Sequence, residues 1–592
     1  MISSKCQGSF LTQEITSNII RIYPMGVVMA NLQFIGGCEM NKKVLIIGGV
    51  AGGASTAARL RRLDEQAEII MFEKGQYISF ANCGLPYYIG GAIKERKNLL
   101  VQTADAMRAR FKIDVRDLSE VIAIDRQSKK VTVRDLRTGN VYEESYDNLV
   151  LSPGAVPVKP PIPGIDNAGI YTIRDIPDTD AIKEHVDRSL ESAVVVGGGF
   201  IGLEMAENLH EIGIKVTIVE AADQVMTPVD YEMAAILHNH IRSKGCELLL
   251  SDGVKAFERE NERNVVLLQS GKRIAADMII LAIGVKPNNL LAKEAGLELG
   301  ITGGIKVNKY LQTSDESIYA VGDAIEVRDF VNDNLVVIPL AGPANKQGRI
   351  AADNIAGRKE EYKGTQGTAI AKVFDMVVAS TGSNEKNMKR LGKEYLTTIT
   401  HSASHAGYYP GANQMAVKCV YTKEGQLLGA QIVGSKGVDK RIDVLAVAVR
   451  HKMSMYDLTE LELSYAPPFS SAKDPVNMAG YAATNVLNGD IAIANWDAAM
   501  HADMHKTFLL DVRESYEFEA GHIPNAVNIP LNTLRNRLDE LPKEKEIIVN
   551  CQVGLRSYIG ARILLQNGFS NVRNLIGGYK TYSQVESDMK ER

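Results

Sequence analysis

The sequence predicts an α/β protein in which short buried strands alternate with helices. Three observations support this fold class. Apolar runs of four or five residues, such as "VLII" at 44–47, have the length of a buried strand rather than of a core helix. Helical patterns follow these runs, and 51 glycines can supply the tight turns between them. At about 100–200 residues per domain, a chain of 592 residues divides into three or four domains.

The first predicted strand ends in a glycine-rich turn. "GGVAGG" at 48–53 is followed by a helical pattern, "ASTAARLRRL", and by a second strand, "EIIMFEK". This order is typical of a dinucleotide-binding unit, in which glycines let the backbone approach a pyrophosphate and an acidic residue binds ribose hydroxyls. The candidate residues are Gly48, Gly52, Gly53 and Glu73; Val50 occupies the middle position where glycine is usual.

A second copy of this pattern begins about 150 residues later and fits better. "AVVVGGGFIGLEMAENLHEIGIKVTIVEAA" places Gly197, Gly199 and Gly202 after a strand, and Glu220 at the end of the next strand. A carboxylate at 220 accepts a bond from a ribose 2′-hydroxyl and repels a 2′-phosphate. The second copy therefore favours NADH, with NADPH as the other option.

A third motif, "TSDESIYAVGDA" at 313–324, ends in an aspartate after a short apolar strand. With all three motifs in this order, residues 41–490 resemble the flavoprotein disulfide reductases that contain two dinucleotide-binding domains. The resemblance implies that the first glycine turn and Asp323 hold FAD, and that the second turn holds the nicotinamide nucleotide. It also implies two nested Rossmann-like domains, followed by an α+β dimerisation domain.

Cys83, in "YISFANCGLPYYIG", is the candidate redox residue of this part of the chain. It could be a packing residue, half of a split site, or a complete redox centre. Dithiol members of the family have a second cysteine five positions later, where this chain has Tyr88. Cys83 must then cycle with an oxygen, as a sulfenic acid, or with a substrate thiol, as a mixed disulfide.

The mixed-disulfide alternative is favoured by residue 51. NADH peroxidases and oxidases of the sulfenic-acid branch have a histidine in the first glycine turn, but Ala51 cannot transfer a proton. "SFANCGLPYYIGG" resembles the coenzyme A-disulfide reductases and their persulfide-reducing relatives. Ser55, Arg59 and Arg62 are spaced by four and three, so they share a helix face that could bind the phosphates of coenzyme A. The resemblance assigns to coenzyme A these three residues together with Ser79, Asn82, Asn345 and Lys473.

Two tyrosine-rich segments lie in the predicted dimerisation domain. The resemblance implies a homodimer with shared active sites, in which Tyr465 and either Tyr408 or Tyr409 reach Cys83 of the opposite subunit. A tyrosine there could donate a proton to a departing thiolate. The residues themselves do not decide between Tyr408 and Tyr409.

The last segment of about 95 residues resembles a rhodanese (sulfurtransferase) domain. Its motifs are "DVRESYEFEAGHIPNAVNIP" and the loop "CQVGLR", which begins at Cys551. Backbone N–H groups of such a loop and the helix that follows favour a thiolate or persulfide anion, and Arg556 can hold an incoming anion. Four residues separate Cys551 from Arg556, one fewer than in tyrosine-phosphatase loops, which suits sulfur better than phosphate.

Composition excludes several other classes of protein. The formal net charge of −4 gives no reason to expect nucleic-acid or membrane-surface binding. Six widely spaced cysteines form no disulfide framework and no metal-ligand pattern, which favours the cytoplasm. Cys246 and Cys419 lie in strand-like apolar contexts and are expected in the core.

The expected domain organisation follows from these motifs. Residues 1–40 are too interrupted by polar residues for a transmembrane span, and we expect translation to start functionally at Met40. The predicted domains are an extension without function (1–40), the FAD-binding domain in two parts (41–155 and 286–362), the NAD(P)H-binding domain (156–285), the dimerisation domain (363–490) and the rhodanese domain (491–592).

Three hypotheses for the activity remain at this point. The first is a flavoenzyme that reduces coenzyme A disulfide or persulfide through Cys83, with Cys551 handling sulfane sulfur. The second is an NADH oxidase or peroxidase with a Cys83 sulfenic acid and an appended sulfurtransferase. The third is a redox sensor or sulfur carrier that binds flavin but turns over slowly, and two intact nucleotide motifs make it the weakest.

Overall fold

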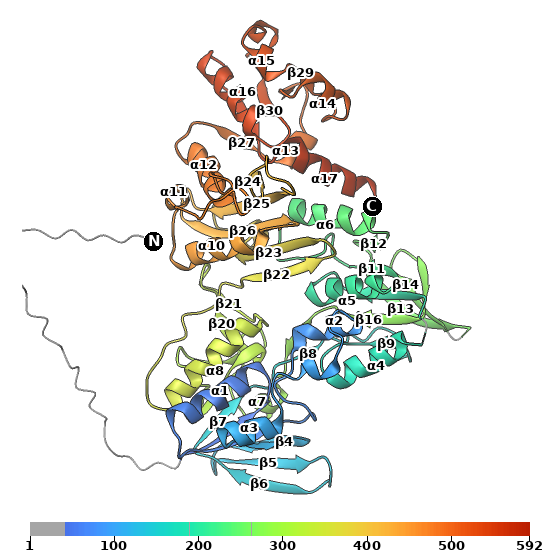
Figure 1. Cartoon of the computed structure of the whole chain (residues 1–592), viewed down its shortest axis with the longest axis vertical. Coiled ribbons are helices and arrows are strands. Elements are labelled where there is room, and N and C mark those ends of the chain that lie inside the picture. Colours follow the sequence, from blue (N-terminus) through green and yellow to red (C-terminus); the bar gives the residue numbers. More distant parts are fainter. Residues whose placement is uncertain (1–41, 189, 262) are drawn as a thin grey trace, which may run out of the picture. The chain divides into compact units, whose positions relative to one another are not determined.

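Parallel sheets dominate the first half of the chain (Figure 1). The structure is a computed structural model that describes residues 42–188, 190–261 and 263–592. The expectation for residues 1–40 therefore lies outside the described residues. The first sheet has the order β19-β7-β1-β2-β3 and all of its pairs are parallel. Its strands are β1 (Lys43–Ile47), β2 (Glu68–Phe72), β3 (Asp114–Arg116), β7 (Asn148–Leu151) and β19 (Ile318–Ala320).

The first sheet brings together segments that are far apart in the sequence. β19 follows the second glycine motif in the chain but pairs with β7, next to β1. Helix α1 (Ala51–Leu63) packs along helix α8 (Ala341–Ile355) beside this sheet. A three-stranded antiparallel sheet extends this part of the chain and consists of β4 (Ser119–Asp125), β5 (Lys130–Asp135) and β6 (Val141–Ser145).

The second parallel sheet has the order β12-β11-β10-β16-β9. Helix α5 (Phe200–Glu211) follows β10, and helix α6 (Tyr231–Ser243) precedes β12. The strands are β9 (Ile170–Tyr171), β10 (Ser192–Val196), β11 (Lys215–Val219), β12 (Glu247–Leu249) and β16 (Met278–Leu281). The antiparallel strands β13 (Val254–Glu260), β14 (Arg263–Leu268) and β15 (Arg273–Ala276) are inserted between β12 and β16.

An antiparallel sheet and a further parallel sheet follow. The antiparallel sheet, β22-β23-β26-β25-β24, packs against helices α10 (Val438–Arg450) and α12 (Pro475–Leu487). Its strands are β22 (Ala369–Val373), β23 (Met376–Gly382), β24 (Leu396–Ala403), β25 (Gln414–Tyr421) and β26 (Leu427–Gly434). Cys419 on β25 and Cys246 before β12 are both buried, as predicted.

The last sheet has the parallel order β27-β31-β30-β28-β29. Helices α14 (Ser515–Glu519), α16 (Leu555–Gln566) and α17 (Gly578–Lys590) accompany it, and α17 packs against α6 of the second sheet. The strands are β27 (Ala492–Ala494), β28 (Thr507–Asp511), β29 (Val527–Asn528), β30 (Glu546–Asn550) and β31 (Val572–Leu575).

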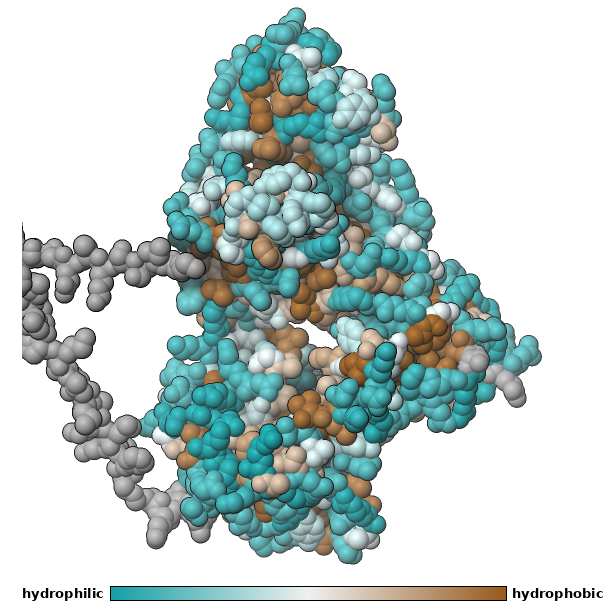
Figure 2. Space-filling model, viewed as in Figure 1, coloured by the Kyte–Doolittle hydropathy of each residue, from teal (hydrophilic) through white to brown (hydrophobic). Residues whose placement is uncertain are grey.

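The visible surface is mainly hydrophilic, with apolar patches between polar areas (Figure 2). Within the described residues, every helix is too short or too polar to cross a membrane.

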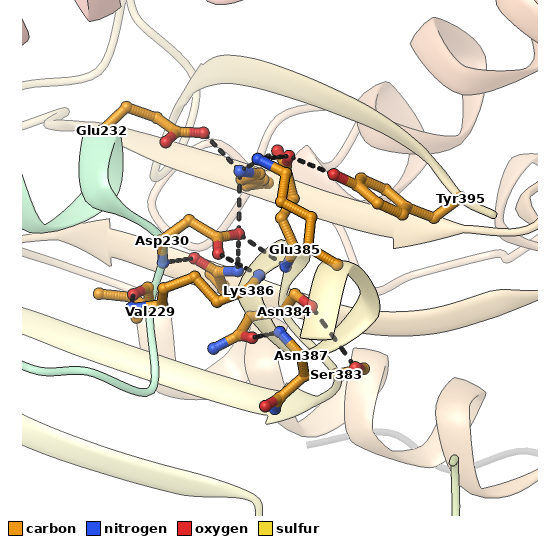
Figure 3. A network of polar contacts seen from close by, with 12 residues as sticks. Val229, Asp230, Glu232, Ser383, Asn384, Glu385, Lys386, Asn387 and Tyr395 are labelled. Atoms are coloured by element: carbon orange, nitrogen blue, oxygen red, sulfur yellow. Dashed lines mark hydrogen bonds and ion pairs between the residues drawn. The ribbon is translucent and has the colours of Figure 1, made fainter. Parts of the chain in front are cut away.

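A buried lysine joins the second sheet's domain to the antiparallel sheet. The side chain of Lys418 on β25 is fully buried, and its Nζ lies 2.9 Å from Asp230 Oδ2 and 2.5 Å from Glu385 Oε1. Glu232 of α6 is its third partner. Figure 3 shows Asp230, Glu232 and Glu385 gathered around this point, with the Tyr395 hydroxyl donating to Glu385. Burial lowers the pKa of Lys418, but the three carboxylates outweigh burial and raise it above its usual value.

We expect Lys418→Met to destabilise the protein by about 3–5 kcal/mol, because it leaves buried carboxylates without their counter-charge. The measurement is the free energy of unfolding in urea, followed by fluorescence. Lys423→Met is the matched control, since Lys423 pairs with Glu394 at the surface. Equal effects of the two substitutions would contradict the role given to Lys418.

Candidate active site

The first glycine turn, between β1 and α1, has no room for a side chain at its glycines. Gly48 has φ +98°, and a Cβ on it would lie 2.1 Å from the Ser152 carbonyl oxygen. A Cβ on Gly53 would lie 1.9 Å from the Gly48 oxygen, and one on Gly52 would lie 2.9 Å from Ser152 Oγ. The start of α1 is thereby held against the end of β1, which leaves a backbone-lined cradle suited to a pyrophosphate.

Two carboxylates complete the first cradle. Glu73 Oε2 accepts a bond of 2.9 Å from the Gly49 N–H, and its Oε1 accepts one of 2.8 Å from Gly75. Asp323 follows β19 in a short 3₁₀ turn (Gly322–Ala324). Burial raises the pKa of both carboxyl groups. The arrangement fits the expected FAD site, in which Glu73 would bind the adenosine ribose and Asp323 the ribityl chain.

The second glycine turn repeats the first almost contact for contact. Gly197 has φ +111°, and a Cβ on it would lie 2.3 Å from the Ala282 oxygen. A Cβ on Gly202 would lie 1.9 Å from the Gly197 oxygen, whereas Gly199 faces open space. Glu220 Oε2 accepts a bond of 2.7 Å from the Gly198 N–H, as Glu73 does from Gly49. This cradle fits a second dinucleotide, NAD(P)H.

Cys83 lies beside both cradles. It occupies a 3₁₀ turn (Asn82–Gly84) that leads into helix α2 (Leu85–Ile89), which packs on α5 of the second sheet. Ser79, at φ +44°, donates its N–H to the Gly49 oxygen at 2.8 Å and so ties this segment to the first turn. Among the described residues no second cysteine accompanies it, because Cys246, Cys419 and Cys551 are buried elsewhere. The split-site interpretation therefore has no partner thiol within the described chain.

Without a bound cofactor, the surroundings of Cys83 disfavour ionisation of its thiol. The residue is exposed overall, but partial burial of its sulfur raises the pKa of the thiol, and the charges of Glu204 and Asp323 raise it further. Glu204, on α5, was not identified from the sequence. Burial, with a smaller contribution from Glu207, raises the pKa of Glu204 to about 7. Its only sequence signal is an acidic residue within the otherwise apolar stretch "FIGLEMA".

The predicted coenzyme A face is formed by α1 and α8 together. Ser55 Oγ donates to Asn345 Oδ1 at 2.5 Å, which brings two of the predicted residues into contact. Arg59 is not free, because its Nη2 lies 2.7 Å from Asp353 of α8. Arg62 is exposed and has no ion-pair partner among the described residues.

Sequence reasoning missed one further arginine on this face. Arg349 is four residues after Asn345 on α8, so it lies on the same side of the helix, and it is exposed without an ion-pair partner in the described part of the chain. Lys473 is likewise exposed. Asn82 places a buried Oδ1 without a hydrogen-bond partner next to Cys83. Such an atom is a natural partner for a ligand.

One contact distinguishes Tyr408 from Tyr409. The hydroxyls of Tyr408 and Tyr465 lie 2.9 Å apart, whereas the ring of Tyr409 packs edge-on against His405. Tyr408 is 77% exposed and Tyr465 is 48% exposed, so both hydroxyls are available to another molecule. Of the two alternatives, Tyr408 is the partner of Tyr465.

Cys551 lies at the base of the loop between β30 and α16. Its Sγ accepts bonds from the Gly554 N–H at 3.2 Å and from Ser557 Oγ at 3.3 Å, and the residue is 1% exposed. The Arg556 guanidinium makes two bonds of 2.6 and 2.7 Å to Glu517 of α14. An incoming anion would therefore compete with Glu517 for Arg556.

Three family matches cover most of the chain. The family described as pyridine nucleotide-disulphide oxidoreductase matches residues 42–348, and the dimerisation domain of that family matches residues 368–475. A rhodanese-like domain matches residues 496–584. The chain belongs to the pyridine nucleotide-disulphide oxidoreductase family. It carries a rhodanese domain in addition.

Individual relatives of this oxidoreductase locate it within the family. A coenzyme A disulfide reductase from Staphylococcus haemolyticus is 37% identical over 449 residues, which are 75% of this chain and all of that protein. A second relative is described by the crystal structure of reduced Bacillus anthracis CoADR-RHD, whose sequence is 53% identical to this chain. The two structures superpose with a TM-score of 0.90, and the match covers 92% of this chain and 98% of that one. An NAD-dependent persulfide reductase from A. fulgidus is 40% identical with a TM-score of 0.86, covering 91% and 100%. The family and fold class inferred from the motifs are thereby confirmed.

We expect Glu204→Gln to lower the pKa of Cys83 in this oxidoreductase, because removal of a neighbouring negative charge favours the thiolate. The pH at which alkylation of Cys83 by iodoacetamide is half-maximal should fall, measured by peptide mass spectrometry of the reduced protein. Glu211→Gln, on the same helix α5 and paired with Lys372, is the control. An unchanged alkylation midpoint in Glu204→Gln would show that this carboxyl does not act on the thiol.

Proposed function

We propose that the protein is an FAD-dependent NAD(P)H oxidoreductase that reduces coenzyme A disulfide or coenzyme A persulfide through Cys83. The observation that carries the proposal is the position of Cys83, a single exposed thiol beside two nucleotide cradles with no second described cysteine in reach. The similarity to a coenzyme A disulfide reductase and to a persulfide reductase supports this substrate class.

The reaction requires a thiolate and two electrons. The Cys83 thiolate attacks the sulfur that bears coenzyme A, forms a Cys83–coenzyme A disulfide and releases coenzyme A thiolate or hydrosulfide. FAD, when bound, supplies the redox chemistry that carries an electron pair from NAD(P)H to this mixed disulfide. The sum is NAD(P)H, one proton and the substrate giving NAD(P)⁺ with two coenzyme A thiols, or with one coenzyme A thiol and hydrogen sulfide.

In this scheme, residues of the chain bind coenzyme A and protonate the departing thiolate. Arg62, Arg349 and Lys473 provide cations for the coenzyme A phosphates, and Ser55, Asn345, Ser79 and Asn82 provide polar contacts. The Tyr408–Tyr465 pair would donate a proton to a departing thiolate from the second subunit of a homodimer. Glu220 at the ribose position favours NADH, with NADPH as the second option.

Cys551 is assigned to sulfane sulfur in this proposal. Its sulfur already receives two hydrogen bonds from the loop, which would also stabilise a persulfide anion. Sulfur delivered through Cys551 to a coenzyme A thiol would produce the persulfide that Cys83 reduces. The cytoplasm is the compartment that we propose, because both thiols must be regenerated in reduced form.

The alternative is an NADH oxidase or peroxidase with a Cys83 sulfenic acid, which an exposed lone thiol permits. Ala51, at the first position of α1, offers no group to protonate a peroxide. Mass spectrometry of the purified protein separates the two cases. An adduct of coenzyme A on Cys83 supports the proposal, and a sulfenic acid supports the alternative.

We expect Cys83→Ser to lower turnover with coenzyme A disulfide and with coenzyme A persulfide by at least about three orders of magnitude, since no nucleophile remains. The assay is oxidation of NADH. Cys551→Ser is the control and should retain reduction of coenzyme A disulfide. Substantial activity of Cys83→Ser would overturn the mechanism.

Arg62→Ala and Arg349→Ala should each raise the KM for coenzyme A disulfide by about tenfold, because each removes a charge-assisted bond to phosphate. The KM for NADH should not change. Arg110→Ala, which removes another exposed arginine, is the matched control. A coenzyme A KM equal to that of the control would exclude the α1–α8 face as the phosphate site.

A further inference from the structure

A carboxylate of the rhodanese domain is buried against the NAD(P)H-binding domain. Asp588, near the C-terminal end of α17, has no exposed surface. Its Oδ2 accepts bonds from the Tyr231 hydroxyl at 2.5 Å and from His238 Nδ1 at 3.0 Å, and its Oδ1 lies 2.6 Å from Arg242 Nη1. All three partners belong to α6. Burial alone would raise the pKa of Asp588, but these partners hold it below its usual value.

His238 links Asp588 to the backbone N–H of Val225. Its Nε2 accepts a bond of 3.1 Å from the Val225 N–H, so the ring proton is on Nδ1 and points to Asp588. Burial lowers the pKa of His238, which agrees with a neutral ring. Asp588 therefore fixes both the tautomer and the orientation of His238.

Val225 lies directly against the second glycine turn. A Cβ on Gly198 would lie 2.7 Å from Val225 Cγ1, and the Met226 N–H donates to the Gly198 oxygen at 2.8 Å. The N–H of the same Gly198 donates to Glu220. The N–H of Gly198 is thus bound to Glu220, and its carbonyl oxygen is bound to the loop that His238 contacts.

The C-terminal arginine contacts the same loop. Arg592 donates to the Asp223 carbonyl, lies 3.2 Å from Asp588 Oδ2, and places its guanidinium carbon 4.9 Å from the centre of the Tyr231 ring. Asp588 near the end of α17 and Arg592 just after it therefore contact the loop that follows Glu220 and the first residue of α6, Tyr231.

We propose that Asp588 is a positioning residue for NAD(P)H: acting through His238, it holds the loop at Val225 against Gly198 and so makes the rhodanese domain part of the NAD(P)H site. The inference rests on the proposed binding of NAD(P)H at the second turn. It predicts that loss of Asp588 weakens NADH binding and leaves the coenzyme A site and Cys83 unchanged, since among the described residues no hydrogen bond joins this loop to either of them.

The test compares full-length holoprotein with Asp588→Asn and His238→Phe. The NADH concentration for half-maximal flavin reduction, measured by anaerobic stopped flow, should rise about 5-fold or more in each variant. The limiting reduction rate and the KM for coenzyme A disulfide should stay within about 2-fold, the scatter expected for a surface control. Glu586→Gln is that control, because Glu586 is on the same helix and pairs with Lys590.

The double variant Asp588→Asn/His238→Phe gives a second readout. If the two residues act in series, the double variant should be no worse than either single one, whereas independent destabilisation would add. Arg592→Ala, a change at the chain terminus that leaves the buried carboxylate in place, should give a smaller rise in half-saturating NADH.

Three outcomes would overturn the proposal. They are an unchanged NADH half-saturation in folded Asp588→Asn, additive effects in the double variant, or a parallel loss of FAD content and coenzyme A affinity. If Asp588→Asn does not fold, an unchanged NADH half-saturation in Arg592→Ala counts against the proposal. Failure of the proposed function itself has a different signature, because wild-type flavin would then not be reduced by NADH at all.

Discussion

The rest of the structure depends on one constraint, which is the close approach of a helix to the end of a strand. Glycines allow this approach twice, between β1 and α1 and between β10 and α5. A Cβ on Gly53 or on Gly202 would lie 1.9 Å from the oxygen of the first glycine of its turn, Gly48 or Gly197. Any side chain there would push the helix away from the sheet and move the phosphate cradle with it. Cys83 depends on the same constraint, because Ser79 ties its segment to the oxygen of Gly49. The turn therefore contributes to the position of the thiol, together with the packing of α2 on α5.

Local patterns were sufficient to predict the fold and the residue types of the site. Strand, glycine turn, helix and acidic residue follow one another within about 25 residues, so the spacing alone locates Gly48, Gly53 and Glu73. Pairings across the chain could not be predicted in this way. Arg59 and Asp353 are 294 residues apart, and nothing near Arg59 indicates that a carboxylate on α8 neutralises it.

Two further features of the candidate site also depend on tertiary contacts. Glu204 looks like an ordinary helix residue until helix packing buries it next to Cys83 and raises its pKa. Tyr408 and Tyr409 are adjacent in the sequence, and they differ in the structure because only the Tyr408 hydroxyl lies next to that of Tyr465, whereas Tyr409 packs on His405. Burial and long-range contacts, rather than residue type, set the surroundings of these side chains.

The described cysteines show how environment sets the fate of a thiol. Burial raises the pKa of Cys246 to about 11 and of Cys419 to about 12, so both are poor nucleophiles at neutral pH. Cys551 is equally buried, yet its sulfur receives an N–H and an O–H bond from its own loop. Because only 1% of Cys551 is exposed, a molecule that reacts with its sulfur must first gain access through the surrounding loop. The loop that donates hydrogen bonds to the sulfur therefore also restricts which molecules can reach it.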